Sequence, residues 1–513
     1  MRKTSRRRFL ETAGSVGAGL FFPGIAAGLQ PQQRIRERGT GGKNNGAGPN
    51  GPPEQGTGRP ATIDPNDPAV VYHADLCEKC DHCEKACGGV MGVMDRYDPE
   101  KTGKAICLHC GQCSAICPHG AVTERFHYQA VSRILSDPQW TAVALVSPST
   151  RVSLGESFGM EHGVNVEGKT VAALKALGFD YVFDVTFGAD MTIMEEAAEL
   201  VGRLRCGGTS GMPMFTSCCP AWVKLAEYWY PEFLPNLSSA KSPILMQGSV
   251  VKTWFARKSG IDPAKIKIAA VAPCTAKKFE ITRPEMNAAG RFGSNPDIRD
   301  IDFSLTNREL GQMISDAKID FTALDEAPFD PAMGRGSGAG IIFGNTGGVT
   351  EAALRTAYRL ETGQDPPEDL LRFEPIRGFD AVREAAVRLG DRTVRVAAVS
   401  GGANIFALLE KIRAKEVSYD FVEVMACPGG CIGGGGQPKT RGRAAGQAAR
   451  TGRSAGLYAI ADRLGEPEAS SYKNRALAAL YSEFLSGTEP GAEETNAHRL
   501  LHTAFTSRAD DLG

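Results

Sequence analysis

The sequence carries almost no net charge and lacks a long, strongly apolar run. Its 58 Lys and Arg residues oppose 59 Asp and Glu residues, which gives a formal net charge of −1. No overall electrostatic field therefore favours nucleic acid or an anionic membrane as a partner. The apolar run 14–29 contains Pro23 and five glycines, and it falls short of the roughly 20 strongly apolar residues that a membrane-spanning helix needs. We therefore expect neither nucleic-acid binding nor a membrane span.

What the sequence does have is cysteine, 14 residues in a chain of 513. The length allows two to four domains, and the hydrophobic content of 42% and charged content of 23% are ordinary for globular proteins. Tight C-x2-C repeats in a long chain favour metal ligation over disulfides, because only closely spaced thiolates can share one cluster. Thirteen of the cysteines fall into two systems, one contiguous and one dispersed, and Cys206 belongs to neither.

The contiguous system is a double repeat of C-x2-C-x2-C-x3-C, which is typical of proteins that carry two 4Fe–4S clusters. In such repeats the first three cysteines hold one cluster and the fourth ligates the other. The alternative, structural zinc, rarely uses eight cysteines in this interleaved pattern. The spacing therefore predicts one cluster on Cys77, Cys80, Cys83 and Cys117, and a second on Cys107, Cys110, Cys113 and Cys87.

The dispersed system consists of cysteines that follow predicted strands. Buried strands are predicted at 141–146, 181–185, 212–215, 266–271, 341–343, 394–399 and 420–424, with helices at 195–204, 223–230, 350–360 and 380–389. This alternation predicts an α/β domain with mostly parallel sheets. Cys219, Cys274 and Cys427 follow three of these strands. Because ligand sites lie at the carboxyl edge of parallel sheets, distant cysteines can converge there.

The chain divides into five predicted segments. An export signal is expected at 1–29, and a Gly- and Pro-rich linker with little to bury at 30–68. A two-cluster α+β ferredoxin-like domain is expected at 69–136, a catalytic α/β domain with two lobes around a buried cluster at 137–440, and a helical tail at 441–513.

The amino-terminal residues resemble a twin-arginine export signal. Ser5-Arg6-Arg7-Arg8-Phe9-Leu10 precedes the weak apolar run, and small residues follow at 26–28. The alternative is a basic tail. Twin-arginine export moves folded proteins, which suits a chain that must acquire its clusters before it leaves the cytoplasm. A periplasmic location is therefore expected.

Three long motifs of the dispersed system resemble those of the iron-iron hydrogenases. They are Thr216-Ser217-Cys218-Cys219-Pro220, Ala272-Pro273-Cys274-Thr275-Ala276-Lys277, and Met425-Ala426-Cys427-Pro428-Gly429-Gly430-Cys431 followed by Gly433 to Gly436. The resemblance covers the chain from about residue 70 to its end. It implies a catalytic cluster in which a cubane is joined by a cysteine to a two-iron site with CO, cyanide and azadithiolate ligands.

The resemblance also implies roles for individual residues. Cys219, Cys274, Cys427 and Cys431 match the cubane thiolates, with Cys431 as the bridge, and Lys277 matches a donor to cyanide. Met425, Phe343, Ser149 and Pro148 match further cofactor-binding positions. The glycines at 433–436 are expected to let the backbone approach the cofactor closely.

A proton route is expected on one helix face. Glu196, Glu199 and Arg203 are spaced i, i+3 and i+7, so they share a face. They match the family's relay, with Ser238 between the two acids and Cys218 next to the cofactor. Read without the resemblance, the same spacing favours an ordinary solvated face.

Some positions depart from the common family pattern. Ala272, Ala276, Ile244 and Ser147 stand where methionine, serine, glutamine and alanine are usual. Changes of this kind around a metal site tune it more than they abolish binding. In the tail, which resembles the family's small subunit, His498 and His502 are spaced i, i+4 and could bind a metal, but a structural wrap is the favoured interpretation.

The expected function is reversible oxidation of H2 to protons and electrons at the diiron-cubane cluster. Electrons would pass through the two 4Fe–4S clusters to a c-type cytochrome or a ferredoxin. Twin-arginine export and diiron-maturation machinery are the other expected partners. The alternatives are a hydrogen sensor with low turnover, and an iron–sulfur electron-transfer or assembly protein without the diiron site. Cys218 and the acid relay argue against the second alternative, because a pure electron carrier needs no proton path.

Overall fold

The computed structural model describes residues 63–512, except 104, 208–210, 441 and 466–468. The expected export signal and most of the expected linker lie outside the described residues. The strands are β1 Val70–Tyr72, β2 Val122–Glu124, β3 Thr141–Val146, β4 Tyr181–Asp184, β5 Met214–Phe215, β6 Ile266–Ala272, β7 Phe303–Thr306, β8 Val382–Leu389, β9 Arg392–Ser400 and β10 Phe421–Met425.

The helices connect and cover these strands. Between β1 and β8 they are α2 His82–Lys85, α3 Pro99–Thr102, α4 Gln112–Ile116, α5 Tyr128–Leu135, α6 Glu167–Ala176, α7 Val185–Arg205, α8 Pro220–Trp229, α9 Pro243–Val250, α10 Ala256–Ser259, α11 Lys277–Glu280, α12 Ala288–Phe292, α13 Asn307–Asp316, α14 Gly338–Ile342, α15 Gly348–Thr362 and α16 Glu368–Leu371. The remaining helices are α17 Gly402–Arg413, α18 Arg443–Leu464, α19 Arg475–Leu480 and α20 Asn496–Leu501.

Two four-stranded sheets form the centre of the molecule. One has the strand order β4-β3-β6-β7 and is parallel throughout, and the other has the order β5-β10-β9-β8, in which only the β8–β9 pair is antiparallel. Strand β3, with sequence TAVALV, is buried from its second residue to its last. Such continuous apolar strands are typical of parallel sheets that are covered on both faces. The predicted α/β fold with parallel sheets is confirmed.

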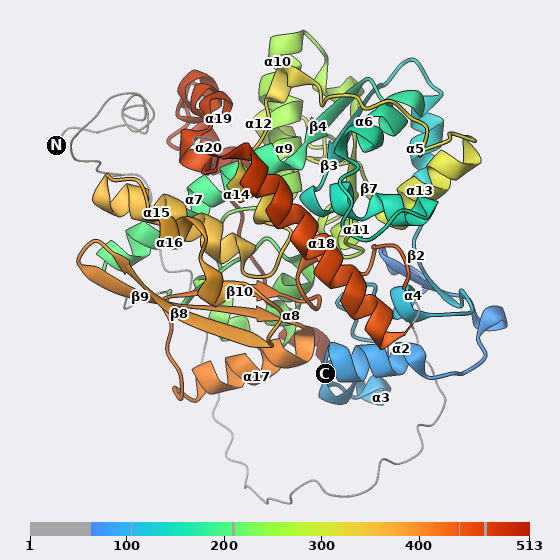
Figure 1. Cartoon of the computed structure of the whole chain (residues 1–513), viewed down its shortest axis with the longest axis horizontal. Helices are drawn as coiled ribbons and strands as arrows, with labels where there is room; N and C mark the ends of the chain where they lie inside the picture. The colour runs from blue at the N-terminus through green and yellow to red at the C-terminus, as the bar shows by residue number, and fades with distance from the viewer. Residues whose placement is uncertain (1–62, 104, 208–210, 441, 466–468, 513) are drawn as a thin grey trace, which may run out of the picture.

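Long helices pack between and around the sheets (Figure 1). Helix α7 packs against α9, α14 and α15, and nearly all of it is buried. Helix α18, in the carboxyl-terminal segment, runs diagonally across the molecule and packs on α14. The carboxyl-terminal segment is therefore helical and packs on the α/β core through α18.

Two predicted elements are wrong. Residues 341–343 belong to the end of helix α14 and the turn after it, not to a strand. The Ser337 hydroxyl caps this helix by accepting from the Gly340 amide at 3.4 Å, and a short apolar run cannot by itself distinguish strand from helix. Residues 382–389 form strand β8 where a helix was predicted. Its pairing with β9 across the two-residue turn at Gly390 outweighs the helix propensity of its Ala, Glu and Arg residues.

The cysteine-rich segment is a small α+β unit on the edge of the core. Strands β1 and β2 pair antiparallel, and α2 and α4 pack together. Its beginning corrects the expected linker boundary, because Asp67 is buried and accepts hydrogen bonds from the amides of Ala69 and Val70 at 2.8 Å. Residues just before 69 are therefore part of the folded unit.

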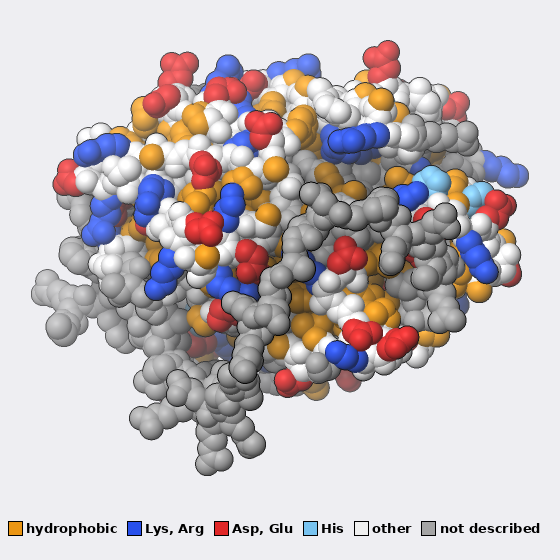
Figure 2. Space-filling view, turned by 90° about the horizontal axis from the view of Figure 1, so that it is seen from below, with side chains coloured by type: hydrophobic (Ala, Val, Ile, Leu, Met, Phe, Trp, Pro, Cys, Tyr) orange, Lys and Arg blue, Asp and Glu red, His pale blue; other side chains and the backbone are white. Residues whose placement is uncertain are grey.

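The surface agrees with the balanced composition. On the face shown in Figure 2, basic and acidic side chains are intermingled over apolar and neutral ones. Among the described residues, no helix is long and apolar enough to cross a membrane.

Candidate functional site

The dispersed cysteines follow strands of both sheets and come together at the carboxyl ends of these strands. Cys219 follows β5 and Cys427 follows β10 of one sheet, whereas Cys274 follows β6 of the other. Cys431 begins a short helical turn after the β10 loop. The Ala426 amide donates to the Cys219 sulfur at 3.4 Å, which ties the ends of β5 and β10 together. Strand topology therefore places all four thiols at one site.

The electrostatics of these thiols indicate how close they are. Burial raises the pKa of Cys274 to about 11, and although Lys277 opposes this rise, the negative charge of Cys219 adds to it. Burial raises the pKa of Cys431, with further contributions from Cys274 and Cys219. Burial also raises the pKa of Cys427, and the other three cysteines add to the effect. The thiolates of Cys274, Cys427 and Cys431 are each destabilised by neighbouring cysteines of this group, which fits a shared cationic centre, and an iron–sulfur cubane is a centre of that kind.

Cys218 lies beside this group in an apolar pocket. It packs in one cluster with Phe343, Met425, Ala189 and Ile193. Burial raises the pKa of the Cys218 thiol, and the charge of Glu196 raises it further. The thiol is therefore held in its protonated form in a dry environment.

Two further cofactor-binding candidates line the same region. Pro148 and Ser149 are buried in the turn after β3, and Ser149 lies against Gly344, which follows Phe343. The Ser149 hydroxyl is buried and has no hydrogen-bond partner among the described residues. A buried polar group without a partner is costly, so the pocket offers an unused donor to whatever occupies it. The residues present therefore fit a polar, iron-containing cofactor.

Lys277 reaches this pocket from the start of α11. Its ammonium donates to the Cys218 carbonyl at 3.1 Å and pairs with Glu280 at 2.7 Å. Burial opposes a charge on Lys277, but Glu280 and then Cys274 outweigh it and raise the pKa above its ordinary value. Lys277 is therefore a fixed cation. Glu280 was missed in the sequence, although its i, i+3 spacing from Lys277 on a helix could have indicated it.

Three of the predicted relay residues, Glu196, Glu199 and Arg203, lie on α7, and Ser238 packs against them from the segment before α9. Arg203 pairs with Glu199 at 2.6 Å, and Ser238 donates to Glu199 Oε2 at 3.0 Å. Glu196 is fully buried, and the Ser217 amide donates to its Oε1 at 3.4 Å. Its Oε2 has no partner among the described residues. The expected face is therefore buried, and the solvated-face interpretation is wrong.

Burial gives Glu196 an unusual proton affinity. Burial raises its pKa to about 8, and the negative charge of Glu199 adds to the rise. A pKa near neutrality suits a group that must both take up and release protons. Ser239, next to Ser238, also donates to Glu199, through its amide at 3.0 Å and its hydroxyl at 3.1 Å. In the sequence, only its position beside Ser238, a predicted relay residue, indicates that Ser239 could belong to the site.

The glycines at 433–436 also allow close approach to other parts of the protein. A Cβ on Gly434 would overlap the carbonyl oxygen of Pro273, and a Cβ on Gly435 would overlap that of Cys110. Among the described residues, the groups that lie closest to these two glycines are backbone carbonyls of other segments of the protein. The glycine turn therefore lets the cysteine-rich segment pack directly against the site of Cys274 and Cys427.

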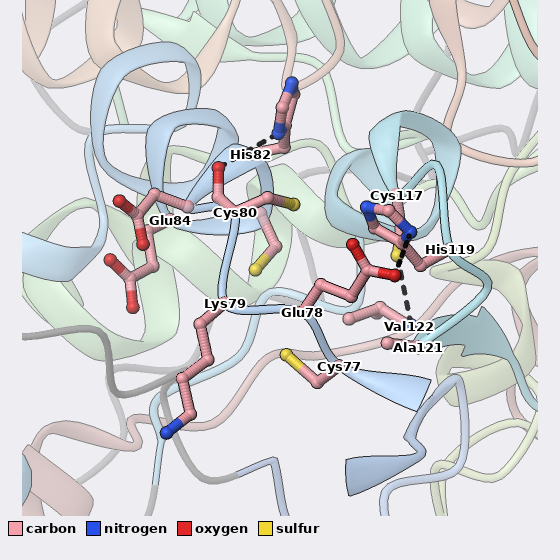
Figure 3. A pocket seen from close by; sticks show the side chains of 12 residues that line it. Cys77, Glu78, Lys79, Cys80, His82, Glu84, Cys117, His119, Ala121 and Val122 are labelled. Atoms are coloured by element: carbon pink, nitrogen blue, oxygen red, sulfur yellow. Dashed lines mark hydrogen bonds and ion pairs between the residues drawn. The ribbon is translucent and has the colours of Figure 1, made fainter. Parts of the chain in front are cut away.

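The cysteine-rich segment holds two thiol groups with different surroundings. Cys77, Cys80, Cys83 and Cys117 line one surface hollow, which we call the outer tetrad. Figure 3 shows the sulfur atoms of Cys77 and Cys80 pointing toward this hollow and the Lys79 side chain pointing away. The spacing predicts a cluster on these four cysteines, and that assignment stays a prediction.

The other four cysteines of the segment lie next to the dispersed cysteines, and we call them the inner tetrad: Cys87, Cys107, Cys110 and Cys113. Burial raises the pKa of Cys113, and Cys107 and Cys87 add to the rise. Burial likewise raises the pKa of Cys110, with further contributions from Cys113, Cys87 and Cys274. Cys110 is thus within electrostatic reach of both the inner tetrad and the catalytic cysteines.

Polar contacts fix the cysteine-rich segment in this position. The Gln112 amide donates to the Gly433 carbonyl at 2.9 Å, and Lys439 donates to the Cys117 carbonyl at 3.1 Å. Arg308 pairs with Glu124 at 2.7 Å. Burial opposes the Glu124 carboxylate, but Arg308 outweighs it and lowers the pKa. These contacts hold the carboxyl-terminal half of the segment against the rest of the protein.

The four positions that depart from the family pattern are all buried around the site. Ala272 ends β6 next to Cys274, and Ala276 precedes Lys277. Ile244 is buried in α9, and the Ser147 amide donates to the Val271 carbonyl at 2.9 Å. The substitutions therefore change packing and polarity near the pocket.

The fold and the site together define an oxidoreductase with a buried four-cysteine cluster site that is connected to a cysteine-rich segment. The family model "Iron only hydrogenase large subunit, C-terminal domain" matches residues 141–435, and "Iron hydrogenase small subunit" matches residues 447–508. The chain belongs to this family and is a hydrogenase of the iron-iron type, with dihydrogen and protons as its substrates and the family's H-cluster as the implied cofactor. Its tail is the small-subunit-like segment.

Individual relatives agree with this membership. Iron hydrogenase 1 of Clostridium pasteurianum is 41% identical over 457 residues, covering 86% of this chain and 77% of the relative. The periplasmic Fe hydrogenase large subunit of Nitratidesulfovibrio vulgaris is 41% identical over 380 residues, covering 67% of this chain and 88% of the relative. A solved structure of the FeFe-hydrogenase HydA1 from Chlamydomonas reinhardtii matches with a TM-score of 0.64 and 35% identity, covering 75% of this chain and 99% of the other.

A more distant group of relatives is named for iron–sulfur cluster assembly. Cytosolic iron-sulfur assembly component 3 of Bos taurus is 30% identical over 430 residues, covering 81% of this chain and 86% of the relative. The larger identity lies with the hydrogenases.

Proposed function

We propose that this hydrogenase interconverts H2 with protons and electrons at a diiron-cubane cofactor held by Cys219, Cys274, Cys427 and Cys431. The observation that carries the proposal is the convergence of these four buried thiols, next to a fifth, Cys218, that is not needed as a ligand. When bound, the cofactor supplies the metal site at which dihydrogen is split or formed. Lys277, Met425, Phe343, Ser149 and Pro148 form its surroundings.

The protein's own groups carry the proton away. The Cys218 thiol holds the first proton outside the cofactor, and the Glu196 carboxylate takes it up. Ser238, which donates to Glu199, connects the two acids. Arg203 holds Glu199 Oε1 in place. A guanidinium stays charged at any working pH, so we assign Arg203 a positioning role rather than a place in the proton sequence.

Electrons leave the catalytic site through the cysteine-rich segment. We propose one 4Fe–4S cluster on the inner tetrad and one on the outer tetrad. The position of Cys110 near Cys274 and Cys427 supports a direct step from the catalytic cubane to the inner cluster. The outer tetrad lines a surface hollow, where a partner protein can approach. A c-type cytochrome is the partner that a periplasmic location favours, and a ferredoxin is the alternative.

The experiment for the cluster assignment is an iron and sulfide assay of anaerobically matured protein, with H2 uptake measured in parallel. We expect three cubanes in addition to the diiron unit, together with H2-dependent dye reduction. A content near one cubane would overturn the assignment of the cysteine-rich segment.

We also propose export by the twin-arginine route. Two observations support it: the motif Ser5-Arg6-Arg7-Arg8-Phe9-Leu10 and the similarity to a periplasmic hydrogenase of Nitratidesulfovibrio vulgaris. The receptor reads the guanidinium pair rather than charge alone, so replacing Arg6 and Arg7 with Lys should leave the protein in the cytoplasm. Fractionation of cells is the measurement, and unchanged delivery to the periplasm would contradict the proposal.

Two other functions are distinguishable from this one. A hydrogen sensor would share the cofactor but turn over slowly. The pocket residues that depart from the family pattern are the reason to consider it: Ala272, Ala276, Ile244 and Ser147. Turnover assays distinguish the two functions. An assembly factor, as in the more distant relatives, would lack the diiron site. The buried acid Glu196 beside Cys218 favours an enzyme that moves protons.

A further inference from the structure

The carboxyl-terminal segment reaches the proposed proton relay with a histidine. Residues on either side of His502 bind the chain next to Ser238, because the Lys241 amide donates to the Leu501 carbonyl and the Thr503 amide to the Ser239 carbonyl, both at 2.8 Å. His502 thus faces Ala240 in a short antiparallel bridge. This pairing places the imidazole beside the Ser239 side chain.

The contacts form a continuous chain of polar atoms. Ser239 Oγ lies 3.1 Å from Glu199 Oε2 and 2.9 Å from His502 Nδ1. His502 Nε2 lies 3.1 Å from Glu195 Oε2. The Tyr481 hydroxyl donates to Glu195 Oε1 at 2.5 Å. Both ring nitrogens of His502 therefore have fixed partners, and the orientation of the ring is set.

Arg203 cannot extend the relay, because it has no acceptor for a proton. Its guanidinium donates to the carbonyls of Gly211, Asn236 and Leu237 at 2.6 to 3.1 Å, besides Glu199. Guanidinium groups remain charged in proteins. A proton that reaches Glu199 therefore needs another group that can both accept and release it, and imidazole is the side chain best suited to this near neutral pH.

We propose that His502 is the next proton-carrying group after Glu199, reached through Ser239. This inference rests on the proposed relay through Cys218, Glu196 and Glu199. In the outward direction, protonated Glu199 gives the proton on Oε2 to Ser239 Oγ, while the Ser239 hydroxyl proton passes to His502 Nδ1. The imidazolium formed then gives its Nε2 proton to solvent or buffer by way of Glu195 Oε2, and the neutral ring moves its remaining proton from Nδ1 to Nε2 through exchange with water, which frees Nδ1 for the next transfer. The inward direction reverses these transfers.

The position of His502 near the surface supports this role. Its side chain is 9% exposed, against 2% for Glu195. Helix α20, which carries its neighbour His498, begins at a capping contact in which the His498 amide donates to Thr495 Oγ1 at 3.3 Å. The His498 ring stacks on His502 with 5.1 Å between centroids, and its side chain is 45% exposed. The small-subunit-like segment therefore contributes a functional group and does more than wrap the core.

The main test compares matched histidine variants of the matured full-length enzyme. Glutamine can hydrogen bond but cannot carry a proton at neutral pH, so His502→Gln should lower kcat by about 10²-fold, the lower end of general acid–base contributions. The KM for H2 should stay unchanged, because binding of H2 is untouched. His498→Gln, which removes the stacked neighbour from the same segment, is the control and should leave kcat and KM unchanged.

Chemical rescue separates proton transfer from a structural role. In His502→Ala, added imidazole should restore turnover, whereas it should have no effect on wild type or on Glu196→Gln. Infrared bands of the cofactor and the unfolding temperature should match wild type in each variant. If His502→Ala loses activity and imidazole does not restore it, His502 is structural and the inference is overturned.

The outcomes also distinguish this inference from the relay on which it rests. If Glu196→Gln loses turnover and His502→Gln does not, the relay stands and the branch through the tail is overturned. If both variants keep full turnover, the relay through Glu196 and Glu199 is itself wrong.

Discussion

The proposed electron route and the proposed proton route, called the electron side and the proton side below, are built in different ways. On the electron side, eight cysteines between residues 77 and 117 come from one contiguous segment, and their spacing alone predicts their grouping. On the proton side, the groups come from α7, the turn after β5, the segment 238–239 and the carboxyl-terminal tail. Local sequence therefore specifies the electron route, whereas only tertiary packing assembles the proton route.

The two sides also differ in how they meet solvent. The outer tetrad lines a surface hollow with the charged residues Glu78, Lys79 and Asp81, which suits contact with a partner protein. The relay begins at a fully buried acid, Glu196, and reaches the surface through single side chains. This difference supports our proposal that a partner protein approaches the outer tetrad.

The largest effect is expected where the two sides meet, at the adjacent residues Cys218 and Cys219. Cys219→Ser should damage the cubane and abolish turnover, because Cys219 is the proposed ligand. Cys218→Ser should keep the clusters but cut H2 turnover by at least about 10²-fold, since a serine hydroxyl is a much weaker acid than a thiol. Iron content and turnover of both variants are the measurements. Near-full activity in Cys218→Ser would show that protons leave by another route.

A similar but smaller loss is expected one step further along the proton side. Glu196→Gln keeps the size of the side chain but cannot take up a proton, so turnover should fall by about 10²-fold, at the lower end of acid–base contributions. Asp190→Asn, at another fully buried acid on α7, tests whether loss of any buried acid has this effect and should be less damaging. Equal losses in both variants would contradict a specific role for Glu196.

On the electron side, the inner tetrad should matter more than the outer one. Cys110→Ser interrupts the step next to the catalytic cubane, whereas Cys77→Ser removes only the terminal cluster. With a small dye as acceptor, Cys110→Ser should therefore be slower than Cys77→Ser by about tenfold, a barrier difference of about 1.4 kcal/mol. Equal rates would show that the dye bypasses both clusters, or that their order is reversed.

The smallest expected effect is a pH dependence on the proton side. Burial and Glu199 raise the pKa of Glu196 to about 8, so this carboxyl keeps its proton below about pH 8 and loses it above. H2 evolution needs the protonated acid and should decline as the pH rises through about 8. Film voltammetry at constant overpotential is the measurement, and the decline should be absent from the residual activity of Glu196→Gln. A decline that persists in this variant would assign the titration to another group.

Particular elements show what could be predicted from the sequence. The strands before Cys219, Cys274 and Cys427 were predictable because buried parallel strands are continuous apolar runs. Residues 382–389 were not, because pairing with β9 determined their structure and not their own helix propensity. The pairing of Lys277 with Glu280 was accessible from helical spacing. The contact between Ser239 and His502, 263 residues apart, left no local signal.

The purpose of the glycine turn at 433–436 also needed the structure. Consecutive glycines predict a close backbone approach, but they do not say what approaches. The structure identifies the carbonyl groups of Pro273 and Cys110 as neighbours, so the turn joins the electron side to the catalytic cysteines.

Infrared spectroscopy of the anaerobically matured enzyme tests the central claim most directly, because CO and cyanide ligands give bands that report the diiron cofactor itself. We predict these bands in the wild type and in Cys218→Ser, and their loss in Cys431→Ser, where the bridge between the cubane and the two-iron site is removed. Absence of the bands from active wild-type enzyme, or their persistence unchanged in Cys431→Ser, would contradict the proposed site.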